Sequence, residues 1–500
     1  MAFARSRAVS LFFCIAAGLC TAAAWLDFSL YPLAWVAFAP FMLAIWRARS
    51  DRGALLVGFA TGLVGLVPAF WWLVYTMQVF GGFPWLVALF FYLCLSVFSA
   101  GEFALFALAA RRLGPGPLGI AAPVVWVAIE FLYPNLFPWR MGHSQLEWTT
   151  MLQIGDLTGP YGMSFVLVWC GAGLAQVIHR RRWLPLAAAV AAALAVYSYG
   201  AWRWDQITAV TAASPRLRVG LVQGNVGIVE KSDAAYFEIN VEKYRALSRR
   251  LQDDVDVLIW PETVSHGWIA QSTTRLAPGE DPFPDLATYL IFGGLGYHYE
   301  RAEVPLRYNT AFLIDGDAAV IARYNKQVLL PFGEYLPFSS WIPFLEEISP
   351  NSGNFTPGVK SMTLNLPGGA RFAPLICYED VPAGIAREMT QLGANVLFTI
   401  FNDAWFGVSM APYQHEAIAL WRAVENRRFF VRVGNAGDTG VIDAHGRIVE
   451  RLGLFTAGTL TADVALLDIE TFYTRHGDVF AWGVLVVALS WLGIALRRAA

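Results

Sequence analysis

Long apolar runs fill residues 1–202 of the chain and return at its end. A helix needs about 20 consecutive apolar residues to cross the hydrocarbon core of a bilayer. Eight stretches come close to that length and are predicted as transmembrane helices: 8–25, 29–46, 54–76, 85–110, 117–133, 161–178, 184–202 and 478–496. Residues 215–475 instead alternate short apolar runs with polar turns, which is typical of a water-facing α/β domain.

Arginines occupy every second connection between these predicted helices. They lie at residues 5 and 7, 47–52, 111–112, 180–182 and 497–498, while the alternate connections are almost free of basic residues. Short cytoplasmic loops carry the Lys/Arg excess in membrane proteins. The pattern predicts that both termini are cytoplasmic and that the α/β block is extracytoplasmic, which in a Gram-negative-type cell means that it lies in the periplasm. The first helix is expected to be retained, because six more spans follow it directly.

Composition agrees with this division. Apolar residues make up 56% and charged residues 15% of the 500 residues, against about 45–50% and 25% in soluble domains. A net charge of −2 argues against a nucleic-acid partner, and five cysteines exclude a disulfide scaffold. The predicted domains are 1–205 (helices one to seven), 215–472 (the α/β domain) and 477–498 (helix eight).

One cysteine stands apart from the others. Cys377 is the only thiol in the α/β block, since the other four lie in predicted membrane helices. It follows the predicted strand 372–376 and precedes a polar turn, a common position for a nucleophile whose thiolate is favoured by backbone N–H groups. A buried core thiol is the alternative, because cysteine is among the most buried residue types.

Two further polar positions follow predicted strands. Glu262 comes after the apolar run 255–259, and Lys326, one of only four lysines, follows the strand 311–314 and its turn. Strand ends meet at one edge of a sheet, so these groups are expected to converge with Cys377. A carboxylate base, an ammonium facing an oxyanion and a thiol together indicate acyl transfer through a thioester. The domain's histidines occupy no clear position as partners of the thiol, and Lys326 at a plain surface site remains an alternative.

Three sequence blocks resemble a known superfamily. Trp260-Pro261-Glu262, Arg323-Tyr324-Asn325-Lys326 with Pro331-Phe332-Gly333-Glu334, and Ile376-Cys377-Tyr378-Glu379 are similar to the Glu, Lys and Cys blocks of the nitrilases. Together with the membrane helices, the chain resembles the apolipoprotein N-acyltransferase family. Asn402–Gly407 and Phe137-Pro138-Trp139, followed by Gly142 and Ser144-Gln145, are similar to further motifs of that family.

The resemblance implies a fold and a set of residue roles. The fold class is a polytopic α-helical membrane domain of about eight helices plus an extracytoplasmic nitrilase-like α-β-β-α sandwich. Glu262 is implied as the general base, Cys377 as the nucleophile and Lys326 as the oxyanion stabiliser. Supporting roles around Lys326 and the substrate pocket are implied for Glu334, Tyr378, Glu379 and Trp405.

The resemblance also implies the substrates. A phospholipid, phosphatidylethanolamine by preference, gives its sn-1 acyl chain to Cys377, and the α-amine of a diacylglyceryl-cysteine apolipoprotein then takes that chain. No cofactor or metal is expected, because the sequence holds no metal-ligand spacing, P-loop or G-x-G-x-x-G motif. The absence of a coiled-coil pattern favours a monomer.

One departure and two rival functions stay open. Many family members place a Trp after the lysine at position 231, where this chain has Ser232; Tyr236 and Trp268 are candidates to replace it. A membrane-anchored nitrilase-type amidohydrolase would use the same triad with a single anchor. A transporter or receptor with a ligand-binding block would not need Cys377.

Three secondary features carry alternatives of their own. The aromatic stretch 336–358 is either a lipid-facing loop or a packed one. Glu102 and Glu130 lie inside predicted helices, where a carboxylate marks either function or hydrogen-bonded packing. His415, with Arg422 and Glu425 on one predicted helix, favours a structural network.

Overall fold

The computed structural model of the chain describes residues 7–299, 305–331, 333–335 and 354–499. The fold divides into two compact units. The helical unit comprises residues 1–74, 86–206 and 475–500, and the α/β unit comprises residues 75–85 and 207–474. The short segment 75–85 therefore groups with the α/β unit although it lies between apolar helices in the sequence.

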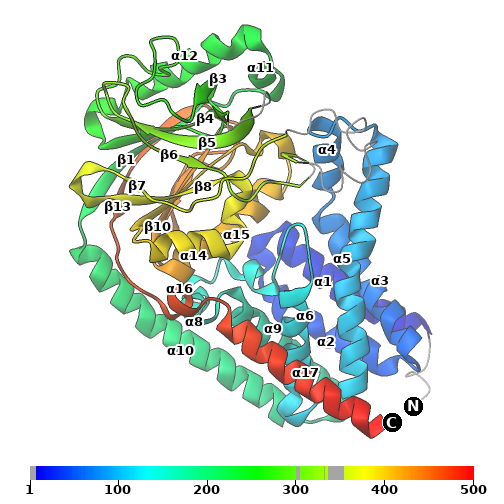
Figure 1. Cartoon of the computed structure of the whole chain (residues 1–500). Coiled ribbons are helices and arrows are strands. Elements are labelled where there is room, and N and C mark those ends of the chain that lie inside the picture. The colour runs from blue at the N-terminus through cyan, green and yellow to red at the C-terminus, as the bar shows by residue number, and fades with distance from the viewer. Residues whose placement is uncertain (1–6, 300–304, 332, 336–353, 500) are drawn as a thin grey trace. The chain divides into compact units, whose positions relative to one another are not determined.

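The helical unit is built from apolar helices joined by short turns (Figure 1). Its helices are α1 (Arg7–Leu26), α2 (Pro32–Arg47), α3 (Asp51–Ala69), α4 (Trp72–Val79), α5 (Trp85–Leu113), α6 (Ala121–Leu132), α7 (Thr149–Leu152), α8 (Gly155–Thr158), α9 (Pro160–Arg180), α10 (Leu184–Ala213) and α17 (Val479–Ala499), of which α4, α5 and α10 cross the division between the units. The 3₁₀ turns η2 (Phe28–Leu30), η3 (Pro117–Gly119) and η4 (Met141–Gln145) link them.

Each predicted span overlaps at least one apolar helix of the structure. Among the described residues, α1, α3, α5, α9 and α10 are long and apolar enough to cross a membrane, while 32–47, 117–132 and 479–495 are shorter apolar helices. The structure therefore contains several helices of membrane length, while the number of eight transmembrane helices stays a prediction. The span predicted at 54–76 is divided into α3 and α4, with Pro68 in the last turn of α3 and the non-helical Phe70 as its cap.

Glu130 holds a loop to the core of the helical unit. Its Oε1 accepts hydrogen bonds from Trp126 Nε1 (3.1 Å) on α6, from Ser164 Oγ (3.1 Å) on α9 and from the main-chain N–H of Met141 (2.8 Å) in η4. Glu102 on α5 accepts a bond from Asn135 Nδ2 at 3.0 Å. Both carboxylates therefore have packing roles, and α5 runs unbroken past Glu102.

The α/β unit is a sandwich of two mixed sheets. The first has the order β13-β1-β2-β4-β5-β6, with β3 also on β4, and the second has the order β12-β11-β10-β9-β8-β7. The strands are β1 (Arg216–Gln223), β2 (Val257–Ile259), β3 (Ser265–Ala270), β4 (Tyr289–His298), β5 (Leu306–Ile314), β6 (Val320–Asn325), β7 (Leu364–Asn365), β8 (Arg371–Ile376), β9 (Val396–Phe401), β10 (Phe429–Gly434), β11 (Gly440–Ile442), β12 (Ile448–Arg451) and β13 (Gly458–Ala465).

Helices cover the outer faces of both sheets. α12 (Phe237–Ser248) contacts β1, β3 and β13, while α14 (Ala383–Gln391) contacts β8 and α15 (Ala411–Asn426) contacts β10. The inner faces meet where β1 contacts β10 and β5 contacts β8, so the layers run helix, sheet, sheet, helix (Figure 1). The remaining helical pieces are α11 (Ile228–Ser232), α16 (Phe472–His476), η5 (Ala234–Tyr236), η6 (Gln252–Asp254), η7 (Pro367–Gly369), η8 (Cys377–Asp380) and η9 (Asp403–Phe406). The predicted α-β-β-α sandwich is confirmed.

The central strands explain the apolar runs in this block. β1, β2 and β4 pair in parallel, as do β8, β9 and β10. β2, β9 and β10 are buried along their whole length, as expected for parallel strands covered on both faces. Lys326, Cys377 and Asn402 come directly after β6, β8 and β9, and Glu262 follows β2 after two residues, so each of these strands is followed closely by a reactive or polar side chain.

Candidate active site

Glu262 lies in a break between two strands that share one neighbour. β2 and β3 pair in succession along the same side of β4, and residues 260–264 form the irregular link between them. The link is fastened by Trp260 N–H to Ile291 O (2.8 Å) and by Val264 N–H to Gly293 O (2.9 Å). This interruption turns the Glu262 side chain out of the strand alternation and into a cavity.

Gly293 on β4 makes room for that link. A Cβ at this position would lie 2.5 Å from the main-chain N of Thr263 and 2.6 Å from the Cα of Glu262. Both of these are backbone atoms, so the clash could not be relieved by a change of side-chain rotamer. Thr263 itself has φ +50°, a region that non-glycine residues seldom adopt.

Lys326 is held between two carboxylates. Its Nζ lies 2.8 Å from Glu334 Oε2 and 3.7 Å from Glu262 Oε1, and the side chain is 1% exposed. Burial works to lower the pKa of this lysine, but Glu334 and Glu262 outweigh it, so the pKa rises above its ordinary value. Lys326 is therefore a permanent cation at neutral pH.

Asn309 on β5 joins the same two carboxylates. Its Nδ2 donates to Glu262 Oε1 (2.7 Å) and to Glu334 Oε1 (2.9 Å). Burial raises the pKa of Glu262, while Lys326, Lys231 and the bond from Asn309 act in the opposite direction. A carboxylate with a raised pKa, buried beside a thiol, is suited to accept a proton.

Cys377 begins the turn that follows β8. Its φ is +51°, so the nucleophile candidate sits in a strained backbone region that side chains other than glycine seldom occupy. Burial raises the pKa of the thiol well above its usual value, Glu262 adds to the rise and Lys326 opposes it. The thiol consequently needs a base before it can react as a nucleophile.

Glu379 ties the cysteine turn to the lysine segment. Its Oε2 accepts the N–H of Ile376 at 2.9 Å, and its Oε1 accepts Tyr324 Oη (2.8 Å) and the N–H groups of Gln327 (2.6 Å) and Val328 (3.0 Å). Burial raises the pKa of Glu379 to about 7, and Lys326 together with these N–H groups works against the rise. The carboxylate therefore sets the distance between the residues flanking Lys326 and those flanking Cys377.

A single cavity of about 560 Å³ joins these groups. Glu262, Lys326, Glu334 and Cys377 all line it, together with the sequence-predicted Trp405. Trp405 in η9 packs edge-on against Phe80 with ring centroids 4.6 Å apart. The polar groups thus lie in a cavity whose wall is partly apolar: Val79, Phe80, Ile228, Leu295, Leu330, Phe355 and Trp405.

Several lining residues were not predicted from the sequence. Asn309 lies within an apolar strand, and Val79 and Phe80 come from a segment that reads as a membrane connection. Lys231 also lines the cavity, although the sequence singled it out only as the neighbour of Ser232. No local motif marks these positions, because each enters the cavity through pairing or packing of distant segments.

Other predicted positions lie elsewhere. Tyr378 is partly buried beside Cys377, and burial raises its pKa to about 12. Tyr236 and Trp268 are not among the described residues that line the cavity; Trp268 is 40% exposed, and the Arg307 guanidinium covers its ring at 5.5 Å. Most of the aromatic stretch 336–358, including Phe338, Trp341 and Phe344, falls outside the described residues.

His415 belongs to a buried network behind the cysteine turn. Its Nε2 lies 2.7 Å from Asp380 Oδ1 and its Nδ1 lies 3.3 Å from Asp403. Burial lowers the pKa of this histidine, but Asp380 and Asp403 outweigh burial and raise it to about 9. Arg432 Nη1 completes the network with Asp380 Oδ2 at 2.7 Å. The imidazolium joins η8 to η9 and is not positioned as a base for Cys377.

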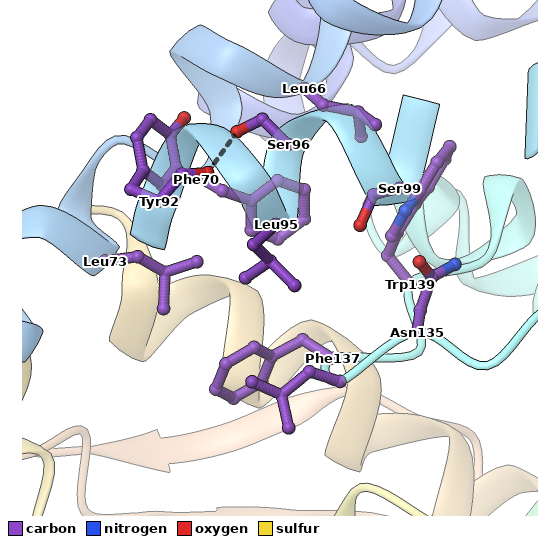
Figure 2. A pocket seen from close by; sticks show the side chains of 11 residues that line it. Leu66, Phe70, Leu73, Tyr92, Leu95, Ser96, Ser99, Asn135, Phe137 and Trp139 are labelled. Atoms are coloured by element: carbon purple, nitrogen blue, oxygen red, sulfur yellow. Dashed lines mark hydrogen bonds between the residues drawn. The ribbon is translucent and has the colours of Figure 1, made fainter. Parts of the chain in front are cut away.

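The helical unit has a small apolar cavity of its own. It holds about 30 Å³ and lies between α3, α5 and the loop that carries Asn135 and Trp139 (Figure 2). Within this cluster, Ser96 Oγ donates to the main-chain oxygen of Tyr92 on the same helix (Figure 2). The three candidate catalytic residues, Glu262, Lys326 and Cys377, line the cavity of the α/β unit instead, so the chemistry is assigned to that unit.

Comparison with known proteins agrees with this assignment. Residues 218–473 match the carbon-nitrogen hydrolase family model. A Saccharomyces cerevisiae protein described as a member of branch 10 of the nitrilase superfamily is 20% identical, with a TM-score of 0.40 over 52% of this chain and 94% of its own. The match to the family model shows that the α/β unit is of the carbon-nitrogen hydrolase class.

The N-terminal part and the full-length relatives identify the family more narrowly. Residues 17–173 match the model of the apolipoprotein N-acyltransferase N-terminal domain. The apolipoprotein N-acyltransferase of Geobacter metallireducens is 32% identical over 93% of this chain and 91% of its own length. That of Bradyrhizobium diazoefficiens is 33% identical over 97% and 94%. The chain belongs to the apolipoprotein N-acyltransferase family.

Proposed function

We propose that this membrane protein transfers the sn-1 acyl chain of a phospholipid, through a thioester on Cys377, to the N-terminal α-amine of diacylglyceryl-cysteine apolipoproteins. The observation that carries the proposal is the convergence of Glu262, Lys326 and Cys377 on one cavity in a chain of this family. The partly apolar wall of that cavity is suited to an acyl chain.

In the first half-reaction, Glu262 takes the proton of the Cys377 thiol and the sulfur attacks the ester carbonyl carbon. The C–S bond forms, and the negative charge that develops on the carbonyl oxygen is stabilised by Lys326, the buried cation of the cavity. The C–O bond then breaks, and the proton on Glu262 passes to the departing alkoxide. A lysophospholipid leaves, and the acyl chain remains on the sulfur.

In the second half-reaction, the neutral α-amine attacks the thioester carbonyl. A C–N bond forms, the C–S bond breaks, and a proton travels from the nitrogen by way of Glu262 to the Cys377 sulfur. Glu379 and Glu334 act as positioning residues, because their contacts hold the segment around Lys326. The membrane confines both lipid substrates, which favours their encounter.

The proposal includes a place and an assembly state. The arginine pattern supports an inner-membrane protein with cytoplasmic termini and a periplasmic catalytic unit. Phosphatidylethanolamine is proposed as the donor, and a single copy as the working unit. The described residues contain no cluster of His, Cys, Asp and Glu that could hold a metal ion, and the proposed steps require none.

The full-length protein, purified in detergent micelles with phosphatidylethanolamine labelled in its sn-1 chain, provides the test. We expect an acyl label that hydroxylamine releases, and its transfer to a diacylglyceryl peptide with a free α-amine. Cys377→Ala should abolish the label. Cys94→Ala, a change of the same kind in α5, should leave it intact.

Two results would contradict the proposal. A label that persists in Cys377→Ala places the acyl group on another residue. A protein that takes no label from any phospholipid but hydrolyses small amides is a membrane-anchored amidohydrolase of the nitrilase type.

A further inference from the structure

The two proposed half-reactions differ in the number of protons they move. In the first, one proton leaves the Cys377 sulfur and reaches the alkoxide. In the second, the acceptor arrives as an α-ammonium, whose ordinary pKa is about 7.7–8.0. It must lose two protons to become an amide N–H. Only one of these can return to the Cys377 sulfur, so the second half-reaction requires one more proton acceptor.

The cationic group already assigned to the site is not free to act as that acceptor. Lys326 is paired with Glu334 and Glu262, and these carboxylates keep it protonated. Glu262 is committed to the proton that shuttles between nitrogen and sulfur. Glu334 accepts bonds from Lys326, from Asn309 and from the N–H of Leu330.

Lys231 lines the same cavity from another direction. It lies on α11, and its Nζ donates to the main-chain oxygen of Glu262 at 2.7 Å. This bond uses one N–H of the amine and none of the side-chain oxygens of Glu262. A neutral amine in this position can keep the bond and still offer its lone pair to a group in the cavity.

We propose that Lys231 is a further catalytic residue, the base that takes the first proton from the α-ammonium of the acceptor in the second half-reaction. This inference rests on the proposed function. Lys231 begins as a cation and gives its own proton to water when the α-ammonium enters the cavity. The α-ammonium then passes one proton to the neutral Lys231 Nζ, and the free amine attacks the thioester carbon. Lys231 is again a cation, as at the start.

The electrostatics of the cavity fit this role. Burial lowers the pKa of Lys231 to about 8, with Glu262 and Cys377 acting in the opposite direction. When the α-ammonium of the acceptor enters, it and the Lys231 ammonium share a poorly solvated space. Repulsion between the two like charges then favours the loss of one proton. The charged and titratable groups around Lys231 are Glu262, Lys326, Glu334 and Cys377 in the cavity and Glu230 on its own helix.

The decisive variant is Lys231→Arg. Arginine keeps a cation and a hydrogen-bond donor near Glu262, but it does not give up its proton. In the full-length enzyme with labelled phosphatidylethanolamine, acyl-enzyme formation should stay within about threefold of the wild-type rate, since arginine preserves the favourable charge beside Glu262. At pH 7, transfer to the diacylglyceryl peptide should be about tenfold slower than in the wild type, a factor that corresponds to one pKa unit, because arginine cannot take the proton of the α-ammonium. The rate should recover above pH 8, where the α-amine is already neutral.

A neutral nucleophile separates proton removal from thioester reactivity. Hydroxylamine is uncharged at pH 7 and needs no prior deprotonation, so it should discharge the Lys231→Arg acyl-enzyme at the wild-type rate. Lys243→Met provides the matched control, because Lys243 lies outside the cavity lining and contacts only the main-chain oxygen of Asn225 among its described hydrogen bonds. It should leave both half-reactions unchanged.

The outcomes are distinct. If Lys231→Arg transfers the acyl chain to the peptide at the wild-type rate at pH 7, Lys231 is a fixed cation and the inference is overturned. If arginine prevents acyl-enzyme formation, Lys231→Met replaces it: a ratio of peptide transfer to hydroxylamine discharge about tenfold below wild type supports the inference, and an unchanged ratio overturns it. Failure of the wild-type enzyme to form any acyl-enzyme refutes the proposed function instead.

Discussion

At the scale of single residues, Glu379 connects the parts of the site most directly. Its two oxygens accept four hydrogen bonds: three from the segment around Lys326 and one from Ile376, the residue before Cys377. Three of the donors are main-chain N–H groups, so the carboxylate acts on the course of the backbone itself. The relative position of Lys326 and Cys377 therefore depends on a side chain that is absent from the lining of the described cavity.

Glu379→Gln is expected to slow acyl-enzyme formation by about tenfold to 100-fold, because a buried donor left without its acceptor costs about 1–3 kcal/mol. The amide would turn an N–H₂ group toward N–H donors. The rate of label incorporation from phosphatidylethanolamine measures the effect. Glu388→Gln, the same exchange at an exposed position on α14, should be silent; a wild-type rate in Glu379→Gln would exclude the positioning role.

The residues that sequence reasoning found and missed differ in how they reach the cavity. Glu262, Lys326 and Cys377 each follow a strand, and position relative to strand ends is readable from an apolar run. Asn309 and Lys231 enter through pairing in the sheet and through a short helix, which no local pattern marks. The roles of the three predicted residues stay predictions, while their common cavity is observed.

At the scale of elements, the break between β2 and β3 decides where the candidate base lies. β4 runs straight past this break, and a Cβ on its Gly293 would lie only 2.5 Å from the main-chain N of Thr263 in the link. A side chain on β4 at this point would displace residues 261–263. The geometry of the base therefore depends on a residue in the neighbouring strand.

Gly293→Ala is expected to slow acyl-enzyme formation by about 100-fold, the effect of a displacement of about 1 Å at a catalytic group. The label assay measures it, and thermal unfolding should show a loss of about 1–3 kcal/mol from overpacking. Gly294→Ala is the matched control, since a Cβ there meets only aromatic ring atoms at 3.3 Å or more. Equal rates in the two variants would show that the close approach does not fix Glu262.

Helices were predicted more exactly than strands. The apolar runs gave the location of all eight predicted spans, because lipid imposes one long and unmixed pattern. The division at Phe70 was missed, since both pieces are equally apolar. Strand partners could not be predicted either: β13 closes the first sheet beside β1, more than two hundred residues earlier in the chain, and pairing at that separation leaves no local trace.

At the scale of the whole molecule, the proposed orientation can be tested by reporter fusion. Alkaline phosphatase folds only where its disulfides form, outside the cytoplasm. A fusion after Ser214, beyond α10, should be active, and a fusion after Arg182, before α10, should be inactive. A fluorescent protein fused at the C-terminus should be fluorescent. The opposite activities would reverse the topology inferred from the arginines.

The grouping of residues 75–85 with the α/β unit has a practical consequence for inhibitor discovery. Phe80 packs on Trp405, and both belong to the wall of the cavity. A soluble fragment cut at residue 207 would lack Val79 and Phe80, so Trp405 would lose its ring contact and the cavity would open to water on that side. Compounds selected against such a fragment would be optimised for a shape that the intact enzyme does not offer. A useful screening target must therefore retain this eleven-residue insert, either in the full-length protein or grafted onto the fragment.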